Sequence, residues 1–205
     1  MPPTMAEPME RVLEQEASDA DLMARVRAGD RDAFADLVDR HKDAVVNYLT
    51  RLSGNRDRAE DLGQETFLRL FRSAGGYVEQ GYLRAYLFRI ATNLVRSQER
   101  RERRQRLLLP LLGGEPDRSE ASAHAGLLRQ EMQRELNAAV ARLPLRYRVP
   151  LVLHEIEGWS YADIAVELDC REGTIKSRIH RGRQSLKRQL ETYWFGGLPS
   201  WKRKG

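Results

Sequence analysis

The sequence contains a single cysteine, Cys170, among its 205 residues. One thiol cannot form an internal disulfide, and it cannot make a zinc site without other ligands close by in the sequence. The four histidines do not supply those ligands, because they are scattered along the chain. We therefore expect neither a metal centre nor a cofactor.

Long hydrophobic runs are also missing. The longest apolar stretch, residues 107–112, is interrupted by Pro110 and is much shorter than the roughly 18 residues that a membrane helix needs. The N-terminal residues lack the basic and apolar regions of a secretory signal. With 41% hydrophobic and 32% charged residues, the composition is that of a water-soluble chain. We expect a cytoplasmic protein with no membrane insertion.

The charges are distributed unevenly along the chain, whose net charge is +5. Residues 1–21 carry six acidic side chains and one arginine, whereas residues 96–106 carry six arginines and two glutamates. A second basic segment, residues 171–188, has seven lysines and arginines and one glutamate. One charged run alone is more often a solvated helix face than a binding site. Two separate basic segments favour contact with a polyanion at two places.

Apolar residues recur at steps of three and four over most of the chain, and no stretch alternates as a strand does. We therefore predict an all-α fold. The first half should hold a short helix from about Asp19 and a long helix between the N-cap Asp30 and Gly54. A third helix should end at the glycines 75 and 76, and a fourth should begin near residue 83 and continue into the first basic segment. The apolar stripe of the third helix is expected to contain Leu62, Phe67, Leu70 and Phe71.

The helical periodicity fails between residues 107 and 125, where prolines and glycines stand among polar residues. This composition is typical of a flexible linker, so we predict two small helical domains joined by it. The expected divisions are an acidic tail 1–17, a first domain 18–106, the linker 107–125, a second domain 126–192 and a C-terminal tail 193–205. In the second domain, a helix over residues 145–157 should tolerate Pro150 only if this proline lies near the first turn.

Residues 160–190 have the pattern of a helix-turn-helix. Ser160 and Asp163 form a capping-box-like pair, and the polar residues 169–171 allow a tight turn before the next helix. Ile175 and Ile179 mark the buried face of that next helix. Its opposite face carries side chains that suit DNA bases and phosphates, namely Lys176, Ser177, His180, Arg181 and Arg183. The alternative is an amphipathic basic helix that packs within a bundle.

Two further polar faces lie on the helices of the first domain. The third helix carries Asp61, Gln64 and Glu65 on one side, which suits a protein partner. The fourth helix has a face that can follow phosphates and pair with exposed bases, formed by Asn93, Arg96, Ser97 and Arg100. Three tyrosines lie nearby, and at helical spacing such residues are more often core than base-stacking residues: Tyr77, Tyr82 and Tyr86.

Three segments match a known pattern in the same order. They read DLGQETFLRLF at 61–71, YLRAYLFRIATNLVRSQERR at 82–101 and LPLRYRVPLVLHEIEGWSYADIAVELDCREGTIKSRIHRGRQSL at 143–186. These segments resemble the bacterial RNA polymerase sigma factors of the extracytoplasmic function (ECF) group. The resemblance implies sigma domain two and sigma domain four, which bind core RNA polymerase and direct it to promoter DNA without an enzymatic activity of their own.

The resemblance also implies roles for the polar faces. Asp61, Gln64 and Glu65 would meet the clamp helices of the β′ subunit, and domain four would dock on the β flap. The minus-10 element would be contacted on its non-template strand by Asn93, Arg96, Ser97 and Arg100, while the loop 73–81 would help to hold an unstacked base. The minus-35 element would be read by Lys176, Ser177, His180 and Arg181, with Arg178 and Arg183 on phosphates. An anti-sigma factor is implied as a further partner.

Two other hypotheses stay open on the residues alone. A stand-alone helix-turn-helix regulator would bind duplex operators, with its first domain serving dimerisation. A recombinase or nuclease would need a catalytic centre, and residues 18–106 show neither clustered carboxylates nor a nucleophile beside arginines. Selectivity for DNA that depends on core polymerase separates the sigma factor from the stand-alone regulator.

Overall fold

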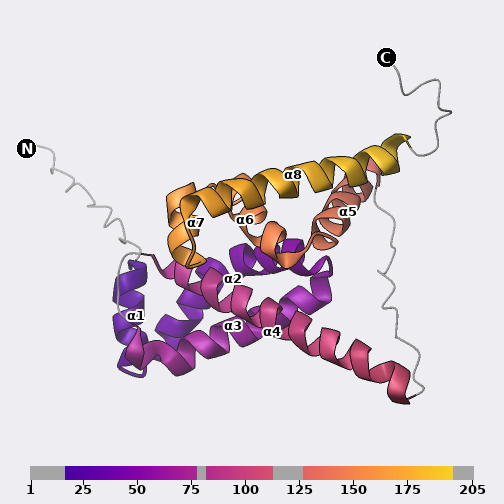
Figure 1. Cartoon of the computed structure of the whole chain (residues 1–205). Coiled ribbons are helices and arrows are strands. Elements are labelled where there is room, and N and C mark those ends of the chain that lie inside the picture. Colours follow the sequence, from indigo (N-terminus) through magenta and orange to yellow (C-terminus); the bar gives the residue numbers. More distant parts are fainter. Residues whose placement is uncertain (1–16, 78–81, 113–126, 196–205) are drawn as a thin grey trace, which may run out of the picture.

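The computed structural model describes residues 17–77, 82–112 and 127–195 (Figure 1). Within these ranges the chain forms helices and no β-strand, which confirms the all-α prediction. The first unit contains α1 (Asp19–Arg27), α2 (Arg31–Ser53), α3 (Arg56–Ser73), the 3-10 turn η1 (Ala74–Gly76) and α4 (Leu83–Leu112). The second unit contains α5 (Leu127–Ala141), α6 (Leu145–Glu155), α7 (Tyr161–Glu167) and α8 (Glu172–Phe195).

Both ends of α2 are set by the residues that the sequence predicts. The Asp30 carboxylate accepts hydrogen bonds from the backbone N–H groups of Asp32 at 2.9 Å and Ala33 at 3.0 Å. These bonds satisfy donors that have no partner within the helix. At the other end, Gly54 has a φ of +73°, the left-handed conformation that terminates many helices and that glycine adopts without strain.

Side chains from α2 and α4 form the centre of the first unit. The rings of Tyr48 and Phe88 stack with their centroids 4.4 Å apart. The hydroxyl of Tyr48 lies 2.7 Å from that of Thr92, so this buried polar group keeps a hydrogen-bond partner. On α3, a Cβ at Gly63 would lie 3.2 Å from a methyl group of Val46. The glycine weakens α3 intrinsically, but it allows α2 and α3 to approach closely.

The second unit contains the predicted helix-turn-helix, made by α7 and α8. The Ser160 hydroxyl accepts a hydrogen bond from the Asp163 N–H at 3.1 Å and so caps α7. In the turn, Asp169 has a φ of +47°, a conformation that aspartate tolerates better than most residues. Ile175 and Ile179 lie on the inner face of α8 and are fully buried, as the periodicity predicts.

The fourth helix continues past residue 106 to Leu112, into the segment predicted as linker. Two details of the sequence prediction are wrong. Pro150 lies in the interior of α6, beyond its first turn, and the helix gives up the hydrogen bond that this residue's missing N–H would have made. Phe71 is 43% exposed and lies against Phe34 at the edge of the first unit, with a centroid distance of 4.9 Å.

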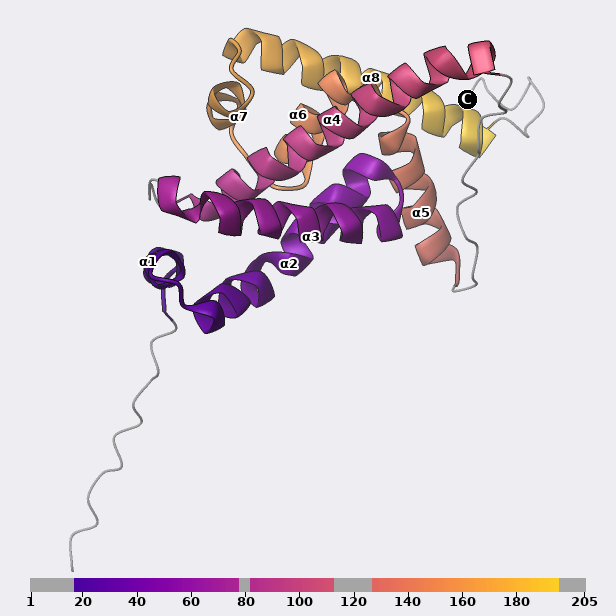
Figure 2. The same cartoon turned by 90° about the horizontal axis from the view of Figure 1, so that it is seen from below.

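The two units pack against each other along α2. Helices α5 and α6 contact α2, while α8 packs on the other helices of its own unit (Figures 1 and 2). The sequence pattern predicts two domains on a flexible linker and does not predict this contact. In the parts of the chain that the structure describes, no helix is both long and apolar enough to cross a membrane.

Candidate nucleic-acid interface

The candidate face on α4 is formed by four polar side chains at steps of three and four residues. Asn93, Ser97 and Arg100 are exposed, and Arg96 is half-buried. Arg100 donates a hydrogen bond to the Ser97 hydroxyl at 3.2 Å. No other described side chain forms a hydrogen bond with the Asn93 amide. The face therefore offers an amide that can both donate and accept, next to arginine side chains.

The candidate face on α8 points away from the buried isoleucines, and its predicted base-reading residues are all exposed: Lys176, Ser177, His180 and Arg181. Lys176 pairs with Glu172 at 2.8 Å, and this partner raises the pKa of the lysine. The Ser177 hydroxyl donates to the Thr174 carbonyl at 2.9 Å. Each of these contacts lies within α8 itself, so the helix presents its polar groups already oriented.

The two arginines assigned to phosphates occupy different environments. Arg183 is exposed and donates through Nε to Glu155 of α6 at 2.7 Å, and this carboxylate raises the pKa of the arginine. Arg178 is half-buried, with a terminal nitrogen 3.7 Å from the sulfur of Cys170. Exposed ion pairs contribute little to stability, so Arg183 can exchange Glu155 for a phosphate at small cost. Arg178 must first move away from the turn.

The predicted partner face on α3 is also present. Asp61 and Gln64 are exposed, and Glu65 accepts a hydrogen bond from Arg69 at 2.8 Å, which lowers the pKa of Glu65. Leu68 and Phe71 continue along this helix at 46% and 43% exposure. Leu68 lies one turn beyond Gln64. The sequence analysis did not single out this leucine, and only its exposure in the structure assigns it to the face. Apolar groups beside polar ones are typical of a surface that a protein partner covers.

The three tyrosines near α4 divide into core and surface residues. Tyr77 is buried and its ring lies 5.0 Å from that of Tyr86, which is half-buried. The Tyr86 hydroxyl lies 3.2 Å from that of Ser73. Tyr82 is 72% exposed at the start of α4. Of the three, only Tyr82 has a free face in this arrangement, and the remainder of the expected base pocket, residues 78–81, lies outside the described residues.

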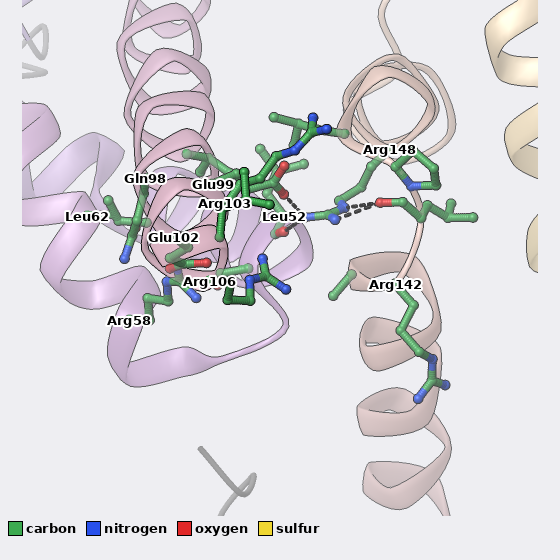
Figure 3. A pocket seen from close by; sticks show the side chains of 17 residues that line it. Leu52, Arg58, Leu62, Gln98, Glu99, Glu102, Arg103, Arg106, Arg142 and Arg148 are labelled. Carbon is green, nitrogen blue, oxygen red and sulfur yellow. Dashed lines mark hydrogen bonds and ion pairs between the residues drawn. The ribbon is translucent and has the colours of Figure 1, made fainter. Parts of the chain in front are cut away.

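Arg148 of α6 joins the two units, and sequence reasoning missed it. Its guanidinium donates to the Leu143 carbonyl at 3.0 Å and to the Leu52 carbonyl at the end of α2, and it lies 3.1 Å from the Glu99 carboxylate of α4 (Figure 3). Burial lowers the pKa of Arg148, but an arginine stays protonated at neutral pH. The side chain therefore cross-links three helices through charge-assisted hydrogen bonds.

Two acidic residues of the second unit reinforce this contact. The side chain of Glu157 is 6% exposed and lies 2.6 Å from Arg84, while that of Glu167 is 8% exposed and lies 2.9 Å from Arg89. Burial raises the pKa of Glu167, which shows that desolvation outweighs the attraction of the arginine. The ring of Trp159 stacks near Phe88 with a centroid distance of 6.1 Å. These ion pairs and the aromatic pair add to a continuous apolar core that the buried residues of both units form.

Taken together, the chain has two basic helix faces, one on each unit, and a polar and apolar face on α3. This defines an all-α DNA-binding protein of two helical units with a helix-turn-helix. The Sigma-70 region 2 family matches residues 37–105, in the first unit, and the Sigma-70, region 4 family matches residues 133–186, in the second. The chain belongs to the ECF group of RNA polymerase sigma factors.

Several curated relatives bear this out. The ECF RNA polymerase sigma factor SigE of Mycolicibacterium smegmatis is 42% identical over 77% of this chain, which spans 62% of that protein. The ECF RNA polymerase sigma factor SigW of Bacillus subtilis is 33% identical over 81% of this chain and 93% of its own length. The RNA polymerase sigma factor CarQ of Myxococcus xanthus is 34% identical over 82% of this chain and 95% of its own length.

Solved structures agree on the fold. The sigma factor RpoE from Bartonella quintana, in complex with the anti-sigma factor NepR, superposes with a TM-score of 0.62 at 29% identity, over 77% of this chain and 96% of that one. CnrH in complex with the cytosolic domain of CnrY gives a TM-score of 0.61 at 22% identity, over 83% and 96% of the two chains. The second of these supports the fold alone.

Proposed function

We propose that the chain binds core RNA polymerase and directs it to promoters, with the second unit reading the minus-35 element as duplex and the first unit holding the minus-10 element as a single strand. The observation that carries this proposal is the presence of two different exposed, basic helix faces on one chain, one on each unit. The face on α8 is rich in cations, two of which are paired with carboxylates of their own unit, whereas the Asn93 amide on α4 has no described side-chain partner. These chemistries suit a paired and an unpaired target respectively.

At the minus-35 element, α8 enters the major groove. Lys176, Ser177, His180 and Arg181 reach base edges from its exposed side, because a helix in the groove directs one face toward the bases. Arg183 gives up Glu155 for a phosphate, and Arg178 does the same after leaving the turn. Phosphate contacts hold the helix in register, and base contacts select the sequence.

At the minus-10 element, α4 captures bases that open thermally. Asn93 donates to and accepts from the edge of an unpaired base, and Arg96 and Arg100 hold neighbouring phosphates. A base that is still paired presents the wrong edge to this face, so binding favours the melted state without hydrolysis. Tyr82 supplies an exposed ring on which a base can stack.

The face on α3 is assigned to the polymerase. Asp61, Gln64 and Glu65 would meet the β′ clamp helices, the second unit would dock on the β flap, and an anti-sigma factor would compete for these surfaces. None of the three α3 residues lies in the contact between the two units, so the face is accessible in the arrangement observed here. Charge and exposed apolar groups together suit a stable but reversible partner.

Run-off transcription with purified core polymerase tests the proposal. The full chain should direct promoter-specific transcripts, and the double variant Asp61→Arg and Glu65→Arg should lose them together with core binding. The matched control reverses two exposed carboxylates of α2, Asp36→Arg and Asp43→Arg, and should retain both activities. Selective DNA binding by the chain alone, unaffected by core polymerase, would instead establish the stand-alone regulator.

A further inference from the structure

A cavity of about 690 Å³ lies between the two units. Its walls come from the ends of α2 and α5, the starts of α3 and α6, and the second half of α4 (Figure 3). Small-molecule sites commonly have volumes of about 300 to 1,000 Å³ and often lie where domains meet. The cavity is therefore large enough for a small ligand and far too narrow for a DNA duplex.

The lining of the cavity has an excess of positive charge. Five arginines contribute to it, against two glutamates: Arg58, Arg103, Arg106, Arg142 and Arg148, with Glu99 and Glu102. Burial lowers the pKa of Arg148, Glu99 raises it in part, and the nearby charge of Arg58 lowers it further. Like charges held this close in a partly enclosed space attract an anion that can neutralise them.

Two of these arginines are not used by the fold. Arg148 is held by two carbonyls and Glu99, Arg58 is paired with Glu102, and Arg142 donates to Gln189 at 3.3 Å. By contrast, neither Arg103 nor Arg106 forms a hydrogen bond or ion pair with any other described side chain. Both line the cavity from α4, one turn apart, and Figure 3 shows their side chains leaving the helix in different directions, so each guanidinium group can bind a different phosphate of one polyphosphate chain.

The remaining wall is apolar and is formed by Leu52, Leu62, Val95, Leu143 and Leu145. Leu52, Val95 and Leu143 are buried, but Leu62 and Leu145 are only half-buried, and a bare phosphate would fill only a small part of such a cavity and would leave these two side chains uncovered. A planar ring can pack on aliphatic side chains and stack on an arginine, while a phosphate chain engages the free guanidinium groups. We propose that the interdomain cavity is a binding site for a nucleoside polyphosphate, with Arg103 and Arg106 on its phosphates.

Occupancy of this site favours the contact between the units. Arg103 and Arg106 belong to the first unit, whereas Leu143, Leu145 and Arg148 belong to the second, so a complete site exists only when the two units are packed together. A ligand that binds one arrangement better than another shifts the population toward it. The nucleotide thereby stabilises the closed arrangement independently of any promoter or polymerase.

Calorimetric titration of the full chain with ATP, without magnesium, tests the site, with AMP and inorganic phosphate as shorter probes. We expect saturable binding of ATP that is at least about tenfold tighter than that of AMP, and an increase in Tm. The double variant Arg103→Ala and Arg106→Ala should weaken ATP binding by at least about tenfold, because two charge-assisted contacts are lost. The matched control, Arg101→Ala and Arg104→Ala, removes the same charge from the same helix outside this cavity and should bind within about twofold of the wild type.

Three outcomes decide against the proposal. Equal weakening by the two double variants would show non-specific attraction to the arginine run. Failure of ATP to bind, with both variants weakening a DNA duplex alike, would show that Arg103 and Arg106 serve only DNA phosphates. The variant Glu157→Lys breaks the contact between the units outside the cavity, so unchanged ATP binding by it would overturn the coupling to closure.

Discussion

The basic helices α4 and α8 differ in what lies behind their exposed faces. α8 packs on α5, α6 and α7, all in its own unit. α4 packs on α2 and α3, but four of its residues, Arg84, Phe88, Arg89 and Glu99, also contact the second unit. The α8 face is therefore independent of how the units are arranged. The α4 face shares its helix with the contact between them, so closure and strand capture can influence each other.

The two faces also differ in how their polar groups are occupied. On α8, Lys176 and Arg183 are paired with carboxylates of their own unit. On α4, the Asn93 amide has no described side-chain partner. Pairing keeps cations extended and oriented, which suits phosphates at fixed positions on a duplex. An unpaired amide suits a flexible strand whose bases can move to it. Four sets of variants test the contact between the units and the division of roles on α8.

The largest effect is expected for Arg148→Ala, which removes the buried link between the units. It leaves two carbonyls and Glu99 without their donor, so we expect the free energy of unfolding in urea to fall by about 2 to 4 kcal/mol. Arg142→Ala, on the same side of the cavity but exposed, should change it by less than about 0.5 kcal/mol. Affinity for a minus-35 duplex should stay within about twofold in both. Equal destabilisation by the two variants would contradict a specific role for Arg148.

The next effect concerns Gly54, where the first unit touches the second. Alanine there must adopt a φ of +73°, and its Cβ would lie 2.6 Å from the Cβ of Ala141. The left-handed conformation costs about 1 kcal/mol or more, and the clash adds to it. Thermal unfolding should show Gly54→Ala to be more destabilising than Gly29→Ala, which has a φ of +92° but no atom within 4 Å. Adding Ala141→Gly to Gly54→Ala should restore only the part of the lost stability that is due to the clash between the two Cβ atoms. An additive double variant would mean that the units do not meet at this point.

The features that could be predicted from the sequence are the local ones. Asp30, Gly54 and Ser160 act within one turn of their own helix, and the buried isoleucines of α8 follow its own periodicity. A pattern of neighbouring residues contains this information because the interactions are between neighbouring residues. The positions of the candidate faces on α3, α4 and α8 follow from the same periodicity, whereas their binding roles rest on the resemblance.

The contact between the units was not predictable in this way. Arg148 reaches the Leu52 carbonyl across a long stretch of chain, and Trp159 reaches Phe88 in the same manner. The residues next to Arg148, Leu52, Trp159 and Phe88 in the sequence do not indicate that these long-range contacts form. One signal was available: Arg148 stands beside the apolar residues 149–153, where a charged side chain must find a partner on burial. Phe71 is the opposite case. Its spacing fits the apolar stripe of α3, but the buried part of that stripe ends at Leu70 and Phe71 is exposed.

A third effect separates base contacts from phosphate contacts on α8. Arg181→Ala should reduce affinity of the polymerase complex for its preferred minus-35 sequence by about 1 to 3 kcal/mol and relax the preference at one base pair. Arg183→Ala should weaken all sequences alike and reduce the salt dependence by about one ion. The neighbouring Arg181 guanidinium lowers the pKa of the Tyr147 hydroxyl, so Tyr147→Phe is the control for a purely positional role of Arg181. Identical losses on every promoter variant would reject the division between the two arginines.

The smallest effect is expected for Glu167, and its sign distinguishes a buried charge from an attractive ion pair. Burial raises the pKa of Glu167 although Arg89 and Arg96 lower it, so the packed arrangement favours the protonated carboxyl more than solvent does. The ionised form therefore costs stability above the raised pKa, and packing becomes more favourable as the pH falls through it. Glu167→Gln resembles the protonated acid, so at pH 7.5 the Tm should be unchanged or slightly higher, which corresponds to a stabilisation of less than about 1 kcal/mol. The variant should also lose part of the increase in Tm that the wild type shows on acidification. Arg89→Ala leaves the carboxylate buried without its partner and should lower the Tm instead. A Tm that falls equally in both variants at pH 7.5 would show that attraction to Arg89, not desolvation, governs this carboxylate.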